Sequence, residues 1–296
     1  MADYEEEGVF AEDLEPIDMS AVPEAEPSGF HTRNDPSNPF QRDNIIDRNK
    51  GHIIIQSEHV DVAHGFMSED SDDACSLVVV AFRFDPNGVA RRIKEAQVVI
   101  TFAALERGKE DPEVVGMEPN GTLFIEPTVQ HETNTVGGAI KASGAGAEIK
   151  LLGSHTVERD TTDSARVRGS IDLRNRKWGG KNSVSWSLLE NATAKSGVVT
   201  RLQAAILLKR RDMAHFKATV TVRVVADTWT ALGSVFKAGS MNSGSDDDDV
   251  WYNPDRKPPS TDRLQKYDVD NLGHVDLKLL SDVAFRTLRV GSIREG

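Results

Sequence analysis

Residues 182–189 (NSVSWSLL), 199–208 (VTRLQAAILL) and 216–225 (FKATVTVRVV) are three apolar stretches rich in β-branched residues, each bounded by Gly, Asn, Lys or Asp. This composition predicts three successive β-strands. In the third stretch, four apolar residues alternate with polar ones, namely Ala218, Val220, Val222 and Val224. Alternation with period two predicts that one face packs on a core and the other faces water.

Similar stretches extend in both directions, at residues 51–62, 76–84, 93–105, 114–117 and 122–125, and as a predicted pair of strands at 157–159 and 165–173. The run SLVVVAFRF at 76–84 is almost continuously apolar, which predicts a strand buried on both faces. About ten short strands without a long helix indicate an all-β fold, an antiparallel β-sandwich. One or two short helices accompany it, the first predicted at 227–236 behind the N-cap Asp227. A last apolar element at 275–288 is expected to close the core.

Residues 1–50 have no helical or strand periodicity, so we predict a disordered acidic N-terminal tail and a single sandwich domain over residues 51–290. The chain has a net charge of −12, but ten acidic residues and no Lys or Arg lie within residues 1–30. The folded part is therefore close to neutral. Acidic residues interleaved with apolar ones form either a solubilising tail or a segment that docks a protein partner.

Cellular location is addressed by the cysteine content and the N-terminus. The chain has one cysteine, Cys75, so an internal disulfide framework is excluded and a reducing compartment is favoured. The N-terminus does not resemble a secretory signal, and no run approaches the ~20 apolar residues of a membrane-spanning helix. We therefore expect a cytoplasmic protein.

The stretch Val136–Leu152 (VGGAIKASGAGAEIKLL) is rich in Gly and Ala. Its composition resembles that of hairpins that pore-forming proteins insert into membranes, but read as one strand it lacks an apolar face. Lys141 then shares a side with Ile149, and Glu148 shares one with Ile140. The alternative is a strand of small residues packed closely within the sandwich, and on this reading membrane insertion is not expected.

Motifs for catalysis and cofactor binding give little support for an enzyme. The sequence has no G-x-S-x-G nucleophile elbow and no Gly-rich phosphate loop. Ser234–Lys237 fits the short S-x-x-K pattern, but Val235 and Phe236 fit the core side of a helix. The neighbouring Asp72 and Asp73 are expected to raise the pKa of the Cys75 thiol. We predict no catalytic residues and no cofactor, and the few basic residues at strand ends do not predict nucleic-acid binding.

Two groups of residues are candidate metal ligands. Asp268, Asp270 and Asp276, with Asn271 and Gly273 between them, resemble a calcium loop in which two expected oxygens are replaced by leucines. The run Asp246–Asp249 could add carboxylates from a neighbouring loop. The alternatives for these two segments are an Asx-type turn and a solvated charge run.

His59, Asp61 and His64 form the second candidate, a zinc site. On a regular strand His59 and Asp61 share a face and His64 lies on the other unless the strand bulges. Zinc needs three or four converging ligands, so ordinary polar residues at a strand end are the alternative.

Four segments carry a resemblance to a known group of proteins: 165–173, 184–191, 204–210 and 267–285. They resemble uncharacterised intracellular β-sandwich-like proteins of filamentous fungi, over roughly residues 50–290. The resemblance implies an intracellular fungal protein and no particular activity or site. The function predicted from the sequence is therefore non-enzymatic binding of an unknown ligand or partner. The alternative is a calcium- or lipid-dependent, membrane-associating sandwich of the pore-forming kind.

Overall fold

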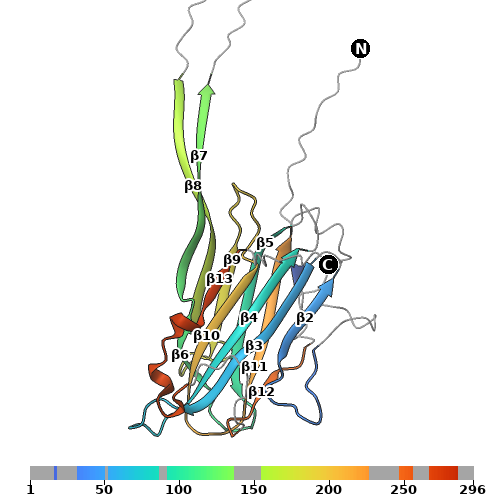
Figure 1. Cartoon of the computed structure of the whole chain (residues 1–296), viewed down its shortest axis with the longest axis vertical. Coiled ribbons are helices and arrows are strands. Elements are labelled where there is room, and N and C mark those ends of the chain that lie inside the picture. The colour runs from blue at the N-terminus through green and yellow to red at the C-terminus, as the bar shows by residue number, and fades with distance from the viewer. Residues whose placement is uncertain are drawn as a thin grey trace, which may run out of the picture.

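The computed structural model describes residues 17–18, 32–50, 53–86, 92–136, 155–226, 247–255 and 267–285. The predicted helix at 227–236, the Ser234–Lys237 motif and most of the Gly/Ala-rich stretch lie outside these residues. Two antiparallel sheets stack face to face (Figure 1), which confirms the all-β sandwich.

The seven-stranded sheet has the order β1-β11-β5-β9-β8-β7, and β12 also pairs with β11. Its strands are β1 (Ile17–Asp18), β5 (Ile93–Ala104), β7 (Gly121–Val136), β8 (His155–Asp172), β9 (Ser183–Leu189), β11 (Phe216–Ala226) and β12 (Val250–Tyr252). The segments at 157–159 and 165–173 both belong to β8. The prediction that they pair with each other is therefore wrong, because the partner of both is β7.

The six-stranded sheet has the order β13-β10-β4-β3-β2, and β6 also pairs with β10. Its strands are β2 (Asn44–Lys50), β3 (Ile53–Phe66), β4 (Ala74–Pro86), β6 (Glu113–Glu118), β10 (Arg201–Arg210) and β13 (Asp282–Ala284). Thus β9, β10 and β11 follow one another in sequence but lie in alternating sheets.

The main core fills the space between the sheets. The apolar residues of β11, from Ala218 to Val224, are buried there as their alternation predicts. Trp186 and Phe82 are among its largest fully buried side chains.

A smaller core covers the outer face of the six-stranded sheet. Two 3-10 helices, η1 (Val269–His274) and η2 (Leu277–Leu280), place Leu272 and Leu280 against Leu77 and Val79 of β4. This cover explains why residues 74–82 of β4 are buried on both faces. The predicted run 76–84 is therefore buried except at Arg83, which is exposed.

The predicted tail is too long at its C-terminal end, because residues 32–50 belong to the folded body. Strand β2 pairs with β3 at the edge of the six-stranded sheet, and Ile45 and Ile46 are buried in the main core. The sequence of this strand, NIIDRNK, is mostly polar, so its composition did not predict a strand. One of the polar residues, Arg48, is buried as well.

Candidate functional site

The most unusual element is the hairpin formed by β7 and β8. The two strands pair from Gly121–Gly169 out to Val136–His155, whereas β9 pairs with β8 only between Arg166 and Asp172. The outer part of the hairpin, 128–136 with 155–163, thus pairs with no third strand in the described part of the chain. Figure 1 shows it extending well beyond the two sheets.

The base of the hairpin is held by a close backbone contact. Trp186 of β9 donates a hydrogen bond from Nε1 to the carbonyl oxygen of Pro119, at 2.9 Å. Gly169 of β8 allows this approach, because a Cβ there would lie 2.1 Å from the same oxygen. The absence of a side chain at residue 169 therefore fixes where the start of β7 lies on the sheet.

A second contact holds the hairpin where it leaves the body. The Asp163 carboxylate accepts hydrogen bonds from the backbone N–H groups of Ser164 (2.8 Å) and Thr193 (3.1 Å). The Asn191 amide donates to the Asp163 carbonyl at 3.2 Å. Hydrogen bonds to the ionised form, first of all that from Thr193, lower the pKa of Asp163. The outer half of the hairpin thus starts from a fixed point.

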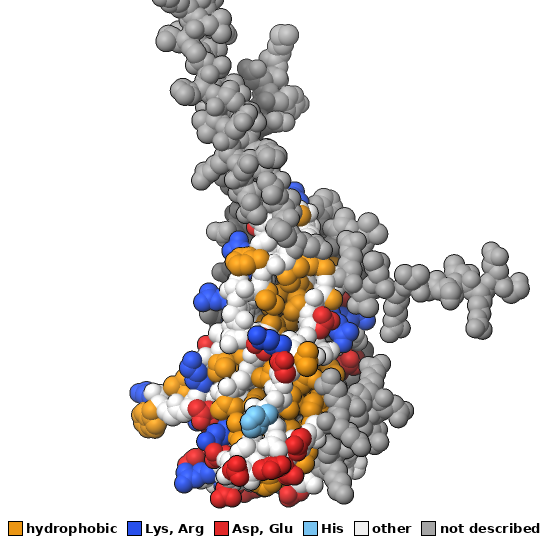
Figure 2. Space-filling view, turned by 60° about the vertical axis from the view of Figure 1, so that its left-hand side comes forward, with side chains coloured by type: hydrophobic (Ala, Val, Ile, Leu, Met, Phe, Trp, Pro, Cys, Tyr) orange, Lys and Arg blue, Asp and Glu red, His pale blue; other side chains and the backbone are white. Residues whose placement is uncertain are grey.

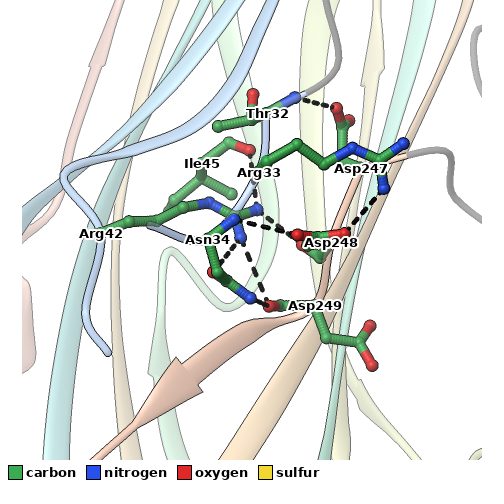
Figure 3. Close-up of polar contacts among 8 residues, drawn as sticks. All are labelled: Thr32, Arg33, Asn34, Arg42, Ile45, Asp247, Asp248 and Asp249. Carbon is green, nitrogen blue, oxygen red and sulfur yellow. Dashed lines mark hydrogen bonds and ion pairs between the residues drawn. The ribbon is translucent and has the colours of Figure 1, made fainter. Parts of the chain in front are cut away.

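The acidic run after residue 246 fastens the N-terminal segment to the body (Figure 3). Asp247 accepts a hydrogen bond from the Thr32 N–H at 2.8 Å and forms a buried ion pair with Arg48 at 2.6 Å. Asp248 accepts from the N–H of Asn34 and the guanidinium of Arg33, both at 2.9 Å. We call these residues, with Arg42, the N-terminal clasp.

Arg42 completes the clasp through backbone carbonyl groups. Its guanidinium donates to the carbonyl oxygens of Asp248 at 2.6 Å and Ile45 at 3.3 Å. Asp249 lies beside the clasp, where its carboxylate binds Lys217 at 2.7 Å and Thr219 at 2.6 Å. An open cavity next to it is lined by Asn34, Pro36, Pro39, Leu105, Lys217, Asp248, Asp249 and Trp251.

The clasp changes the interpretation of Asp247–Asp249. The sequence suggested extra calcium ligands or a solvated charge run, but these three carboxylates bind cationic side chains, a hydroxyl group and backbone N–H groups. Asp246 lies outside the described residues. The partners of Asp247 and Asp248 are 199 to 215 residues away in sequence, so no local pattern could have predicted them.

Of the candidate calcium residues, Asp268 and Asp276 cap the two 3-10 helices, and Asp270 lies in the first turn of η1. Asp268 accepts from the N–H of Asp270 at 3.2 Å and from the amide of Asn271 at 2.9 Å, and Asp276 accepts from the N–H of Lys278 at 3.0 Å. These contacts are those of Asx-type turns. Nowhere in the described ranges do three His, Cys, Asp or Glu side chains come together closely enough to hold a metal ion. Calcium binding stays a prediction.

A bulge in β3 separates the candidate zinc ligands. The pairing with β4 shifts between His59 and Asp61, so that His59 lies opposite Val80 and Asp61 opposite Val79. Val80 belongs to the main core and Val79 to the outer core. Asp61 is therefore turned to the outer face of the sheet, away from His59 and His64.

Both histidines instead bind neighbours near the N-terminal segment. His59 bonds the Arg42 carbonyl oxygen at 2.7 Å and the Tyr252 hydroxyl at 2.8 Å. His64 bonds the Ser76 hydroxyl and the Gln41 amide, both at 2.7 Å. Burial lowers the pKa of His59 to about 4 and that of His64 to about 3. Both rings are therefore neutral at pH 7.

Cys75 is buried, and that burial raises its thiol pKa to about 12. The prediction of a raised pKa is confirmed, but its physical cause is desolvation rather than the charges of Asp72 and Asp73. Asp73 is in an ion pair with Lys209 at 2.7 Å.

Comparison with known proteins adds little. No family model and no curated protein matches this chain. Among solved structures, the Clostridium perfringens NetB toxin in its membrane-inserted form has a TM-score of 0.27 and 10% identity, covering 59% of this chain and 78% of that one. None of the helices in the described part of the chain has the length and hydropathy of a bilayer crossing.

Proposed function

We propose that this protein associates with membranes and inserts a hairpin, made of β7, β8 and the residues between them, to form a pore with other copies of the chain. The observation that carries the proposal is the outer half of the hairpin, residues 128–136 paired with 155–163, which extends beyond both sheets (Figure 1). A two-stranded hairpin away from a core is marginally stable in water. Its length therefore calls for a role outside the sandwich.

The sequence between the strands fits insertion once the register of the hairpin is used. In the inserted state we propose, the β7–β8 pairing continues from the Val136–His155 pair toward the tip of the hairpin and ends in a turn at residues 145–146. Beyond the Val136–His155 pair, the residues on one side are then small or apolar: Gly138, Ile140, Ala142 and Gly144 opposite Gly153, Leu151, Ile149 and Ala147. When residues 136–152 are read as one strand, there is no turn at 145–146. Charged and apolar residues then appear on the same side of the strand.

The other side of the same hairpin carries the charged residues. Lys141 then lies opposite Lys150, and Ser143 opposite Glu148. Strands that line a membrane channel alternate apolar residues toward lipid with polar residues toward the water-filled interior. Residues 136–144 and 147–155 are nine residues each, close to the ~9–11 residues that cross a bilayer as a strand.

One hairpin alone cannot remain in the bilayer, because its outer edges would leave backbone groups without hydrogen bonds. Strands from several copies must pair until the ring closes. Within the described part of the chain, no third strand pairs with the outer edge of β7. The same holds for residues 155–165 of β8 on the edge away from β7. These free edges supply the backbone groups that neighbouring hairpins need.

Release of a trapped dye from vesicles tests the proposal. Vesicles of phosphatidylcholine with cholesterol, with ergosterol or with phosphatidylserine would be exposed to the full chain, with calcium or with a chelator. We expect release from at least one composition. Ile140→Lys places a charge in the middle of the lipid-facing side, which costs roughly 2–4 kcal/mol per copy, and should abolish release.

Ser143→Lys is the matched control, because it puts the same charge on the water-facing side and should leave release nearly unchanged. Failure of the wild-type chain to release dye from every composition would overturn the proposal. So would equal activity of the two lysine variants. A difference between calcium and chelator would support the predicted calcium dependence separately.

The prediction of a non-enzymatic partner-binding protein remains distinct from this proposal. The acidic part of the tail lies almost entirely outside the described residues. Pull-downs with the full chain and with a chain lacking residues 1–31 address it without disturbing the clasp, and identical partner sets would remove the tail from that role.

A further inference from the structure

An exposed patch lies at the base of the hairpin, on the outer face of the seven-stranded sheet. Phe124 of β7 pairs with Arg166 of β8, which pairs with Leu189 of β9, so the three lie in one row across the strands. Arg168 is two residues further along β8. Phe124 is 67% exposed and Leu189 is 38% exposed, and both arginines are exposed. We call these four residues the Phe124 patch.

The composition of this patch is typical of the centre of a protein interface. Aromatic residues and arginine are enriched there, and they carry much of the binding energy. The patch also includes a residue of β7, the last strand of its sheet, so it reaches the edge of that sheet. Figure 2, in which the left-hand side of Figure 1 comes forward, shows a band of apolar side chains along this edge of the molecule with Lys and Arg side chains beside it.

A complementary acidic surface lies at the opposite side of the molecule. Three exposed carboxylates lie there: Asp43 directly before β2, Asp47 on β2 and Glu58 on β3. Asp47 is next to Gln56, whose amide binds it at 3.2 Å. Further in on the same sheet, Arg83 is in an ion pair with Asp85. We call the three carboxylates the acidic edge.

We propose that the Phe124 patch of one copy binds the acidic edge of a second copy. The two surfaces lie at diagonally opposite corners of the sandwich, since β7 ends one sheet and β2 ends the other, on opposite sides of the molecule (Figure 1). Each copy can therefore bind one neighbour through its Phe124 patch and another neighbour through its acidic edge. Such head-to-tail contacts close into rings when the rotation between neighbouring copies returns to its start, and form open filaments otherwise.

Charge decides between this arrangement and a two-fold dimer. A patch that met its own copy would bring arginines against arginines, and two acidic edges would bring carboxylates together, which is unfavourable. Pairing patch with acidic edge brings opposite charges together. The inference rests on the proposed function in one respect, because pore formation is what requires several copies side by side.

Two charge-reversal variants test the contact. The first carries Arg166→Glu and Arg168→Glu, and the second carries Asp47→Lys and Glu58→Lys. Each alone should assemble on the order of tenfold less on vesicles than the wild type, because like charges would meet at every contact. Assembly is measured by mass photometry after solubilisation in detergent, and circular dichroism with thermal unfolding checks that both variants fold.

Mixing the two variants in equal amounts should restore assembly. The acidic patch of the first then meets the basic edge of the second, and the unchanged patch and edge complete the alternating ring. Phe124→Ser should also reduce assembly, and no partner variant should rescue it. Arg107→Glu with Lys177→Glu, which changes exposed charges in loops outside the patch, is the control and should assemble normally.

The outcomes separate this contact from the proposed function. Normal assembly of either charge variant alone, or failure of the mixture to recover, overturns the contact. Wild-type rings that release no dye overturn pore formation and leave the contact supported. A wild-type chain that never assembles on vesicles overturns both.

Discussion

Arg48 and Asp247 form an ion pair with 2.6 Å between Nη2 and Oδ2, and their side chains are only 6% and 4% exposed. The pair joins β2 to the segment before β12 within the clasp. Removing one partner of a buried pair leaves the other charge without compensation, which typically costs about 3–5 kcal/mol. We expect Asp247→Ala to lower the free energy of unfolding in urea by this amount.

Arg33→Ala is the matched control for this measurement. Arg33 and Asp248 form a pair of similar length, 2.9 Å, but the Arg33 side chain is 66% exposed, so its loss should cost no more than about 1 kcal/mol. Equal effects of the two variants would show that the clasp does not stabilise the fold through the buried pair.

His64, which is buried, and His59, which is partly buried, predict loss of stability in mild acid. In the unfolded chain a histidine binds its proton near pH 6.5, whereas burial lowers the pKa of His59 to about 4 and that of His64 to about 3. The unfolded state thus binds more protons below pH 6.5, so stability falls as the pH drops from 6.5 toward 4. Since one pKa unit corresponds to about 1.4 kcal/mol, the urea midpoint should fall steadily across this range.

A variant at His64 isolates the contribution of this histidine. The lowered pKa values of Asp163 and Asp248 act below their usual value of 3.8, outside the histidine range. His64→Gln should therefore flatten the curve between pH 6.5 and 4 and leave the steeper fall at lower pH. An unchanged curve would mean that His64 already binds a proton in the folded state.

The contact of Gly169 with Pro119 predicts a sensitive position at the base of the hairpin. A methyl group on residue 169 would come within 2.1 Å of the Pro119 carbonyl oxygen and 2.9 Å of the Met117 side chain. Overpacking of this kind costs about 1–3 kcal/mol, and backbone on one side cannot move aside cheaply. We expect Gly169→Ala to lower the melting temperature by several degrees, and a neutral result would show that the start of β7 is not held there.

The strands and their buried faces could be predicted from the sequence, because alternation is a local signal. Ala218 to Val224 and residues 76–82 are examples. The partners of Asp247 could not, since Thr32 and Arg48 come from a segment whose polar composition resembles a tail. The zinc hypothesis depended on an unbroken β3, and the bulge after His59 reverses the side on which Asp61 lies.

The register of the hairpin changes the interpretation of its sequence. Without a turn, the stretch from Val136 to Leu152 mixes charged and apolar residues on both sides. The pairing of Val136 with His155 fixes the numbering across the hairpin. Ile140, Ile149 and Leu151 then fall on one side, and of the large apolar residues Leu152 alone falls on the side of the charged residues. The alternation was in the sequence, but its phase changes at a turn that composition alone does not locate.

Single-cysteine labelling tests this phase residue by residue. Cys75 is the one cysteine of the chain. Its burial keeps the thiol pKa near 12, so the thiol reacts slowly. The substitution Cys75→Ser removes this background thiol. An environment-sensitive dye would be attached to cysteines introduced singly at residues 139–143 in that background. On vesicles, we expect blue-shifted emission at 140 and 142, which face lipid, and emission typical of water at 139, 141 and 143. Uniform emission across the five positions, or the opposite alternation, would contradict the proposed hairpin.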